Sequence, residues 1–141
     1  MIKCYLQRRN AQLITLCCSL LLLCSCATTT RTEQNIEKRA TERWNAVLSG
    51  DLAGAYEFLS PGYRSSMSLN QYQRSVLLMR LKWTGARYLE SECKETTCKV
   101  KISVDYTLYG ALPGVKSFDS TQVIQESWVL VDNRWYLVPD K

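Results

Sequence analysis

The chain has 141 residues, with 18 Lys and Arg against 13 Asp and Glu, a net charge of +5, seven cysteines and no histidine. This length suits one globular domain with a single core. The lack of histidine excludes Ser-His and Cys-His nucleophile systems. Neither a phosphate-cradling glycine loop nor an EF-hand pattern occurs, so we expect no metal site and no cofactor.

The amino terminus has the three-part organisation of a secretory signal peptide. Lys3, Arg8 and Arg9 form a basic segment, and an uncharged apolar run follows over residues 11–23. This run of about 13 residues is too short for a spanning helix, which needs roughly 20. We therefore expect export and removal of residues 1–25. A buried core helix or a tail anchor is the alternative.

The apolar run ends in Leu23-Cys24-Ser25-Cys26, which resembles the lipobox of bacterial lipoproteins. In that motif a Leu lies three residues before the modified Cys and a small residue directly precedes it, which fits Cys26 and not Cys24. The resemblance implies lipidation of Cys26 with two or more acyl chains, enough for stable membrane anchoring. Ala27, in place of an Asp, implies sorting to the outer membrane, with the protein facing the periplasm.

The mature chain differs from the precursor in charge and in cysteine content. Loss of residues 1–25 removes three basic and no acidic residues, which lowers the net charge to +2 and gives no indication of a nucleic-acid partner. Besides Cys26, only Cys93 and Cys98 remain. In an oxidising compartment this pair predicts a disulfide across a hairpin turn, with a redox or metal site as the alternative.

A short polar tether, opened by Thr28, Thr29 and Thr30, is expected to follow Cys26 and to end at residue 32. Its extended length is at most about 20 Å. The tether therefore places the folded domain, residues 33–141, close to the lipid surface.

Helical periodicity and capping signals predict three helices, over residues 33–48, 52–59 and 69–81. Asp51 is the expected cap of the second helix, which Ser60-Pro61-Gly62 ends. Ser68 with Gln71 forms a capping box at the start of the third. The aromatic and Met positions of these helices are interpreted as core residues.

After residue 82 the pattern alternates, which predicts four strands, over residues 82–93, 98–109, 121–131 and 134–138. A loop is expected from Leu112-Pro113-Gly114, and Asp132-Asn133 is expected to form the turn of the last hairpin. The sequence therefore predicts an α+β fold, with three N-terminal helices packed on a curved four-stranded antiparallel sheet.

Several segments also resemble small bacterial proteins of the nuclear transport factor 2-like superfamily, which is cystatin-like and cone-shaped. The resemblance rests on Trp44 and on four segments, Gly50-Asp51-Leu52, residues 55–61, residues 126–130 and residues 135–139. The resemblance covers most of residues 33–139 and implies a bent sheet around a long helix, with a pocket at the wide end of the cone. Members include isomerases, dehydratases, transport factors and accessory domains of envelope proteins, and many form homodimers.

An isomerase of this family needs a carboxylate base in the pocket and a donor for the oxyanion. Glu126 is the weak catalytic candidate, because it alternates with apolar residues on one strand face. The candidate pocket residues are Tyr88, Tyr106, Glu126 and Trp128. The alternative for Glu126 is a structural salt bridge or hydrogen bond with Arg87, Lys101 or another basic residue.

We therefore expect a membrane-anchored lipoprotein whose domain acts as a binding or accessory module in the cell envelope, without catalysis and with an envelope protein as partner. A small apolar-ligand-binding or isomerase-like enzyme that uses Glu126 is the alternative. A basic patch near the third helix is interpreted as a solvated face, with contact to anionic headgroups as the alternative. Its residues are Arg74, Arg80, Lys82 and Arg87.

Overall fold

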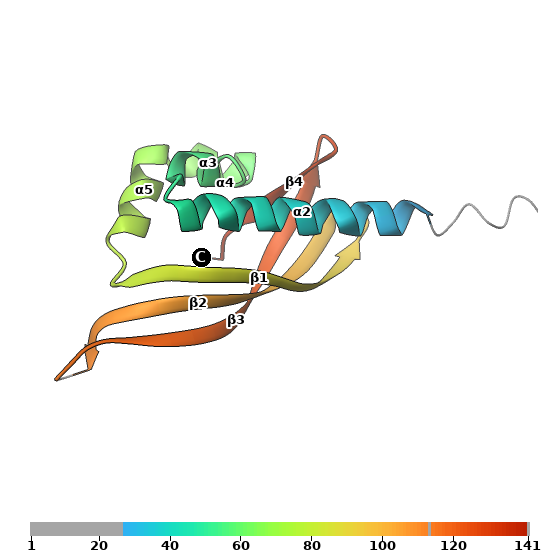
Figure 1. The fold of residues 1–141 in the computed structure, drawn as a ribbon. Helices are drawn as coiled ribbons and strands as arrows, with labels where there is room; N and C mark the ends of the chain where they lie inside the picture. The colour runs from blue at the N-terminus through green and yellow to red at the C-terminus, as the bar shows by residue number, and fades with distance from the viewer. Residues whose placement is uncertain (1–26, 113, 141) are drawn as a thin grey trace, which may run out of the picture. The chain divides into compact units, whose positions relative to one another are not determined.

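The computed structural model describes residues 27–112 and 114–140. The predicted signal peptide and the lipidation site Cys26 lie outside the described residues. Residues 33–141 form one compact unit, whose elements Figure 1 shows. Among the described residues, no helix combines the length and hydrophobicity needed to cross a membrane.

The described part of the chain begins with four helices, which precede all the strands. They are α2 (Ala27–Ser49), α3 (Leu52–Tyr56), α4 (Pro61–Ser66) and α5 (Leu69–Leu77). The helix α2 begins six residues before the predicted start at residue 33. Its apolar stripe is buried as the periodicity predicted, since Ile36 and Ala40 have no exposed area and Trp44 is 4% exposed.

The second predicted helix, over residues 52–59, is shorter in the structure, and a further helix that the sequence did not predict follows it. Asp51 caps α3 by accepting a hydrogen bond from the Gly54 amide at 2.9 Å, and α3 ends at Tyr56. Ser60 then caps α4 by accepting from the Tyr63 amide at 3.2 Å, with Pro61 in the first turn. Pro61 fits a first turn because its missing N–H would have no helical partner there. Ser60-Pro61, predicted to end a helix, therefore begins one.

The helix α5 has the predicted capping box, in which Ser68 and Gln71 bond one another's backbone amides. It ends at Leu77, four residues before the predicted end. Of the apolar face expected here, Tyr72 is buried, whereas Met79 is 45% exposed. The core assignment of Met79 is therefore wrong, because the helix stops before that position can turn inward.

The four strands form one antiparallel sheet in the order β1-β2-β3-β4. They are β1 (Leu81–Lys94), β2 (Thr97–Leu112), β3 (Val115–Val131) and β4 (Arg134–Val138). The strand β3 begins six residues before its predicted start, because residues expected to form a loop pair with β2 as far as Leu112 and Val115. The β3–β4 turn lies at Asp132 and Asn133, whose φ angles of 48° and 60° are the positive values expected there.

The predicted fold class is wrong in its arrangement of helices. The structure has four helices, of 23, 5, 6 and 9 residues, instead of three N-terminal helices packed on the sheet, and about half of residues 33–141 lie in strands. The three-helix nuclear transport factor 2-like cone therefore does not describe the chain. The cause is local, since Ser60-Pro61, interpreted as the end of the second helix, also begins the additional helix α4.

Buried side chains of α2, α3, α5 and three strands form one core. On β2, Val100, Ile102 and Val104 alternate into it, each at most 1% exposed. On β3 the same face carries Glu126 and Trp128. The strand β1 forms one edge of the sheet, and its register with β2 shifts at two places, between Trp83 and Gly85 and between Tyr88 and Glu90.

Candidate functional site

The carboxylate of Glu126 lies inside the core and is paired with a helix residue. Arg43 of α2 donates from Nη1 to Oε1 of Glu126 at 2.6 Å. The two side chains are only 13% and 6% exposed, so this ion pair is mostly removed from water. The partner is thus Arg43, one of the unnamed basic residues that the sequence left open, and Lys101 instead bonds Glu90.

Two indole groups complete the environment of this carboxylate. Trp44 donates from Nε1 to Oε1 of Glu126 at 3.0 Å, and Trp128 donates from Nε1 to Oε2 at 3.0 Å. Both carboxylate oxygens therefore accept hydrogen bonds from fixed side chains. A buried carboxylate that is paired and accepts hydrogen bonds on both oxygens can join elements, here α2 to β3.

Tyr72 of α5 lies next to this ion pair. Its ring packs against Tyr56 with centroids 5.7 Å apart. Burial raises the pKa of the Tyr72 phenol, and the nearby charge of Arg43 acts in the opposite direction. Tyr72 is therefore a neutral neighbour of the pair at physiological pH.

A second arginine of α2 packs on β4, one turn before Arg43. The guanidinium of Arg39 lies 4.0 Å from the ring centroid of Phe58, and its Nε donates to the Trp135 carbonyl at 3.4 Å. Burial lowers the pKa of Arg39, and the like charge of Arg134 adds to this effect. Arg39 and Arg43 thus attach one face of α2 to the core through their charged ends.

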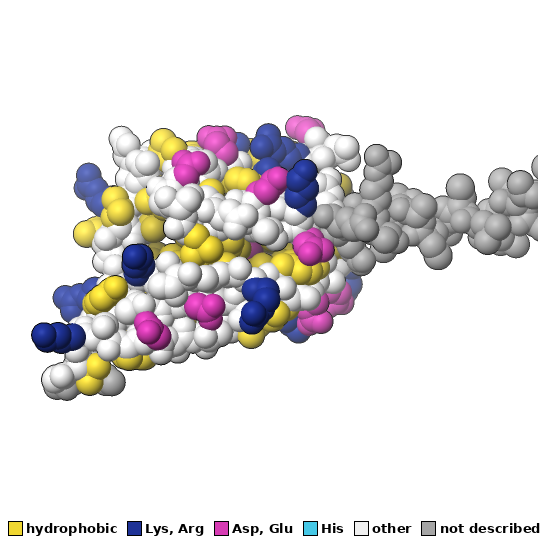
Figure 2. Space-filling view, in the orientation of Figure 1, with side chains coloured by type: hydrophobic (Ala, Val, Ile, Leu, Met, Phe, Trp, Pro, Cys, Tyr) yellow, Lys and Arg dark blue, Asp and Glu magenta, His cyan; other side chains and the backbone are white. Residues whose placement is uncertain are grey.

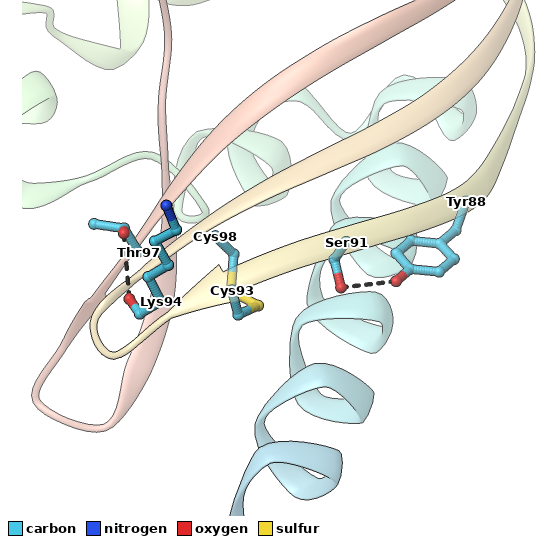
Figure 3. Close-up of a disulfide and its surroundings, with 6 residues drawn as sticks. All are labelled: Tyr88, Ser91, Cys93, Lys94, Thr97 and Cys98. Carbon is cyan, nitrogen blue, oxygen red and sulfur yellow. Dashed lines mark hydrogen bonds between the residues drawn. A yellow bond between two sulfur atoms is a disulfide. The ribbon is translucent and has the colours of Figure 1, made fainter.

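Of the predicted pocket residues, Trp128 bonds Glu126, whereas Tyr88 and Tyr106 have other partners. The Tyr88 hydroxyl donates to Ser91 Oγ at 2.9 Å (Figure 3). The ring of Tyr106 packs edge-on against Trp83 at 5.8 Å, and Trp83 in turn packs against Trp44 at 5.4 Å. Within the described residues no hydrogen bond joins Tyr88 or Tyr106 to Glu126.

The predicted cysteine pair lies at one end of the sheet, which we call the disulfide end (residues 91–101, 125–131 and 134–138). The structure joins Cys93 of β1 to Cys98 of β2 by a disulfide, with Cα atoms 4.0 Å apart (Figure 3). Glu95 in the intervening turn has a φ of 42°, and Thr97 Oγ1 donates to the Lys94 carbonyl at 3.3 Å. The bond therefore closes the β1–β2 turn at the point where both strands begin to pair.

A cavity of about 380 Å³ opens at the disulfide end. Cross-strand partners build it, since Lys99 pairs with Ser127 and Ser127 with Val138, while Thr97 pairs with Val129. Lys99 Nζ donates to Ser127 Oγ at 2.8 Å. The remaining lining residues are Glu92, Lys94, Cys98 and Trp128. Apolar walls with charged groups at the rim suit an amphipathic ligand or side chain.

Sequence reasoning missed both Arg43 and this cavity. Arg39 and Arg43 lie four residues apart beside the apolar stripe of α2, a spacing that places them on one helix flank next to the core. That spacing was the signal for an arginine reaching inward. No local signal marks the cavity, because its walls come from four different strands.

Comparison with known proteins shows a likeness in fold to a solved structure. No family model matches the chain. No curated protein matches it either. A SEC-C motif containing protein from Rhodopseudomonas palustris, known from a solution structure, is similar with a TM-score of 0.53 and 15% identity over 69% of this chain and 70% of that chain. At this identity the likeness concerns the fold alone.

Proposed function

We propose that this chain is a lipid-anchored protein of the bacterial cell envelope whose unit of residues 33–141 binds a partner and does not catalyse a reaction. One observation carries the second part: both oxygens of Glu126 are occupied by Arg43, Trp44 and Trp128. A general base must keep an oxygen within reach of the substrate proton. Glu126 instead has the contacts of a structural ion pair.

The lipid anchor is supported by the sequence alone. The basic segment, the short apolar run and Leu23-Cys24-Ser25-Cys26 together resemble a lipoprotein signal. With an acylated Cys26 the protein is held at the membrane, where an outer-membrane, periplasm-facing location follows from Ala27. The partner in this proposal is an envelope protein.

The experiment is affinity purification from detergent-solubilised membranes, with the native chain beside Cys26→Ala. Mass spectrometry of the bait reports acylation of Cys26 and the state of Cys93 and Cys98. We expect an acylated bait with an envelope protein near stoichiometry, and loss of that protein with Cys26→Ala. An unacylated bait, or an acylated bait that returns alone and whose deletion leaves envelope complexes unaltered, contradicts the proposal.

A second candidate function, binding of a small amphipathic molecule, is favoured by the cavity at the disulfide end. Val129→Arg fills this cavity, whereas Val123→Arg places the same charge on the same face of β3 six residues away. In a thermal-shift screen, a true ligand raises the melting temperature of the wild type and of Val123→Arg and leaves Val129→Arg unchanged. Equal responses of all three chains would eliminate the cavity as the site.

A further inference from the structure

Among the side chains that the structure describes, nine large hydrophobic ones remain exposed, and six of these lie at the end of the unit opposite the disulfide. They are Leu77, Leu78, Met79, Tyr109, Val115 and Phe118. Leu77 and Leu78 keep 75% and 74% of their area exposed. Scattered exposed apolar residues are normal in soluble proteins, but a cluster of this kind marks an interaction site.

The pairing of the strands brings these residues together. Arg80, directly after α5, accepts a hydrogen bond through its carbonyl from the Tyr109 amide at 3.0 Å. Leu81 then pairs with Leu108, and Leu108 pairs with Phe118. The C-terminal end of α5, the start of β1 and the β2–β3 turn therefore lie at one end, which we call the basic end (residues 74–82, 106–110 and 114–118).

This end is basic as well as apolar. Its exposed cations are Arg74, Arg80, Lys82 and Lys116. The sequence contains no Asp or Glu between Glu57 and Glu90, and none over residues 106–118. The adjoining acids are Asp105 and Asp119, which accept hydrogen bonds from Thr121 and Thr107, each at 2.6 Å. In Figure 2, basic and apolar side chains gather at the end formed by α5 and the β2–β3 turn.

We propose that the basic end docks on an anionic lipid surface. Exposed Leu side chains enter the boundary between headgroups and acyl chains, while Lys and Arg beside them attract anionic headgroups. Tyr109 adds an aromatic residue of the kind that favours this depth. The side chains come from three separate segments, and a fluid surface accommodates them without the shape complementarity that a protein partner requires. This contact does not depend on acylation of Cys26.

The test uses the full chain and reads the contact residue by residue. Amide hydrogen exchange is measured on vesicles of phosphatidylcholine and on vesicles of equal parts phosphatidylcholine and phosphatidylglycerol. We expect slowed exchange over residues 77–82 and 106–118 on the anionic vesicles only, with the disulfide end unchanged. Because the readout is local, binding through residues 1–26 does not imitate it.

Two pairs of variants separate charge from apolar insertion. Replacing Arg80 and Lys82 with Gln lowers the partition coefficient of the chain onto anionic vesicles by about 30-fold, about fivefold for each charge. The matched control, Lys94→Gln with Lys99→Gln, removes two exposed lysines from the disulfide end and leaves partition unchanged. Leu77→Ser with Leu78→Ser abolishes the protection, whereas Leu89→Ser with Val123→Ser, also exposed, retains it.

Three outcomes overturn the proposal. The first is unchanged exchange at the basic end on anionic vesicles, and the second is equal protection on phosphatidylcholine alone. The third is protection that an acidic protein gives and vesicles do not, which would make this end a protein-binding surface. Protection confined to anionic vesicles, with the expected response of both variant pairs, supports it.

Discussion

The strand β2 runs from the disulfide end to the basic end, and the two ends differ in how far their apolar side chains are exposed. At the disulfide end, Cys98 and Val100 are at most 2% exposed, and the charge of Glu126 beside them is paired. At the basic end, Tyr109 and Phe118 keep 48% and 37% of their area exposed. The same alternating pattern therefore buries apolar side chains at one end and leaves them exposed at the other.

The difference follows from what covers each end. At the disulfide end, Arg43 and Trp44 of α2 reach the strands. At the basic end the covering helix α5 stops at Leu77, and Leu78 and Met79 are left at the surface. We therefore expect mutations at the disulfide end to change mainly the free energy of unfolding. Mutations at the basic end should change mainly binding to the lipid surface.

The largest loss of stability is expected at the buried ion pair. Glu126→Ala leaves Arg43 charged, buried and unpaired, which should lower the free energy of unfolding by about 3–5 kcal/mol. Denaturant titration measures this loss. Glu57→Ala is the control, because its pair with Arg64 is more exposed and contributes about 1 kcal/mol or less. Equal losses in the two variants would show that the buried pair does not hold α2 to the sheet.

The next effect is expected from the disulfide. Replacing Cys93 and Cys98 with Ala removes a bond that closes a loop of six residues, so unfolding should become easier by about 2 kcal/mol. Reduction of the native chain is a second route to the same change. Hydrogen exchange should quicken near the β1–β2 turn and stay constant at the basic end. Quickening at both ends would mean that the ends are not separable.

A smaller effect is expected from acid at the exposed pair of Lys101 and Glu90. Lys101 donates to Glu90 at 2.6 Å, and this hydrogen bond lowers the pKa of the Glu90 carboxyl. The pair therefore adds stability above the usual pKa of Glu, about 4.3, and loses it as the pH falls through the lowered value. Melting temperatures across this range should fall slightly more in the native chain than in Glu90→Gln. Glu37→Gln, on α2, should follow the native curve.

The smallest effect on stability is expected at the basic end. Leu77→Ser with Leu78→Ser should change the free energy of unfolding by no more than about 0.5 kcal/mol, because neither side chain is packed. Val123→Ser, also exposed, is the comparison. Thermal unfolding of the native chain, the double Leu variant and Val123→Ser measures these changes in stability. A loss well above that limit would place the two leucines in the fold and weaken their assignment to a lipid surface.

Much of the sheet was predictable because its signals are local. Alternation located the buried face of β2, and Asp132-Asn133 located the last turn. The beginning of β3 was missed, because residues 115–120 are strand only through pairing with β2. The tendency of such a segment to form a strand depends on the strand it pairs with, and the sequence alone does not show that partner.

The helices and the site show the same limit. Ser60-Pro61 is a local signal with two meanings, a stop for one helix and a start for the next, and only the following turn distinguishes them. The inward face of Glu126 was predictable from alternation. Its partner was not, because Arg43 lies 83 residues away and several other basic residues satisfied the same expectation.

The two register shifts of β1 have a consequence for aggregation. A long, regular edge strand offers a row of unpaired amides and carbonyls to any other strand, and sheets extend from molecule to molecule in this way. The shifts after Trp83 and after Tyr88 divide this edge into short segments, and the hydrogen-bonding register changes from one segment to the next. A strand from another molecule cannot keep one hydrogen-bonding register along all of these segments. The exposed edge is therefore a poor template for fibril growth.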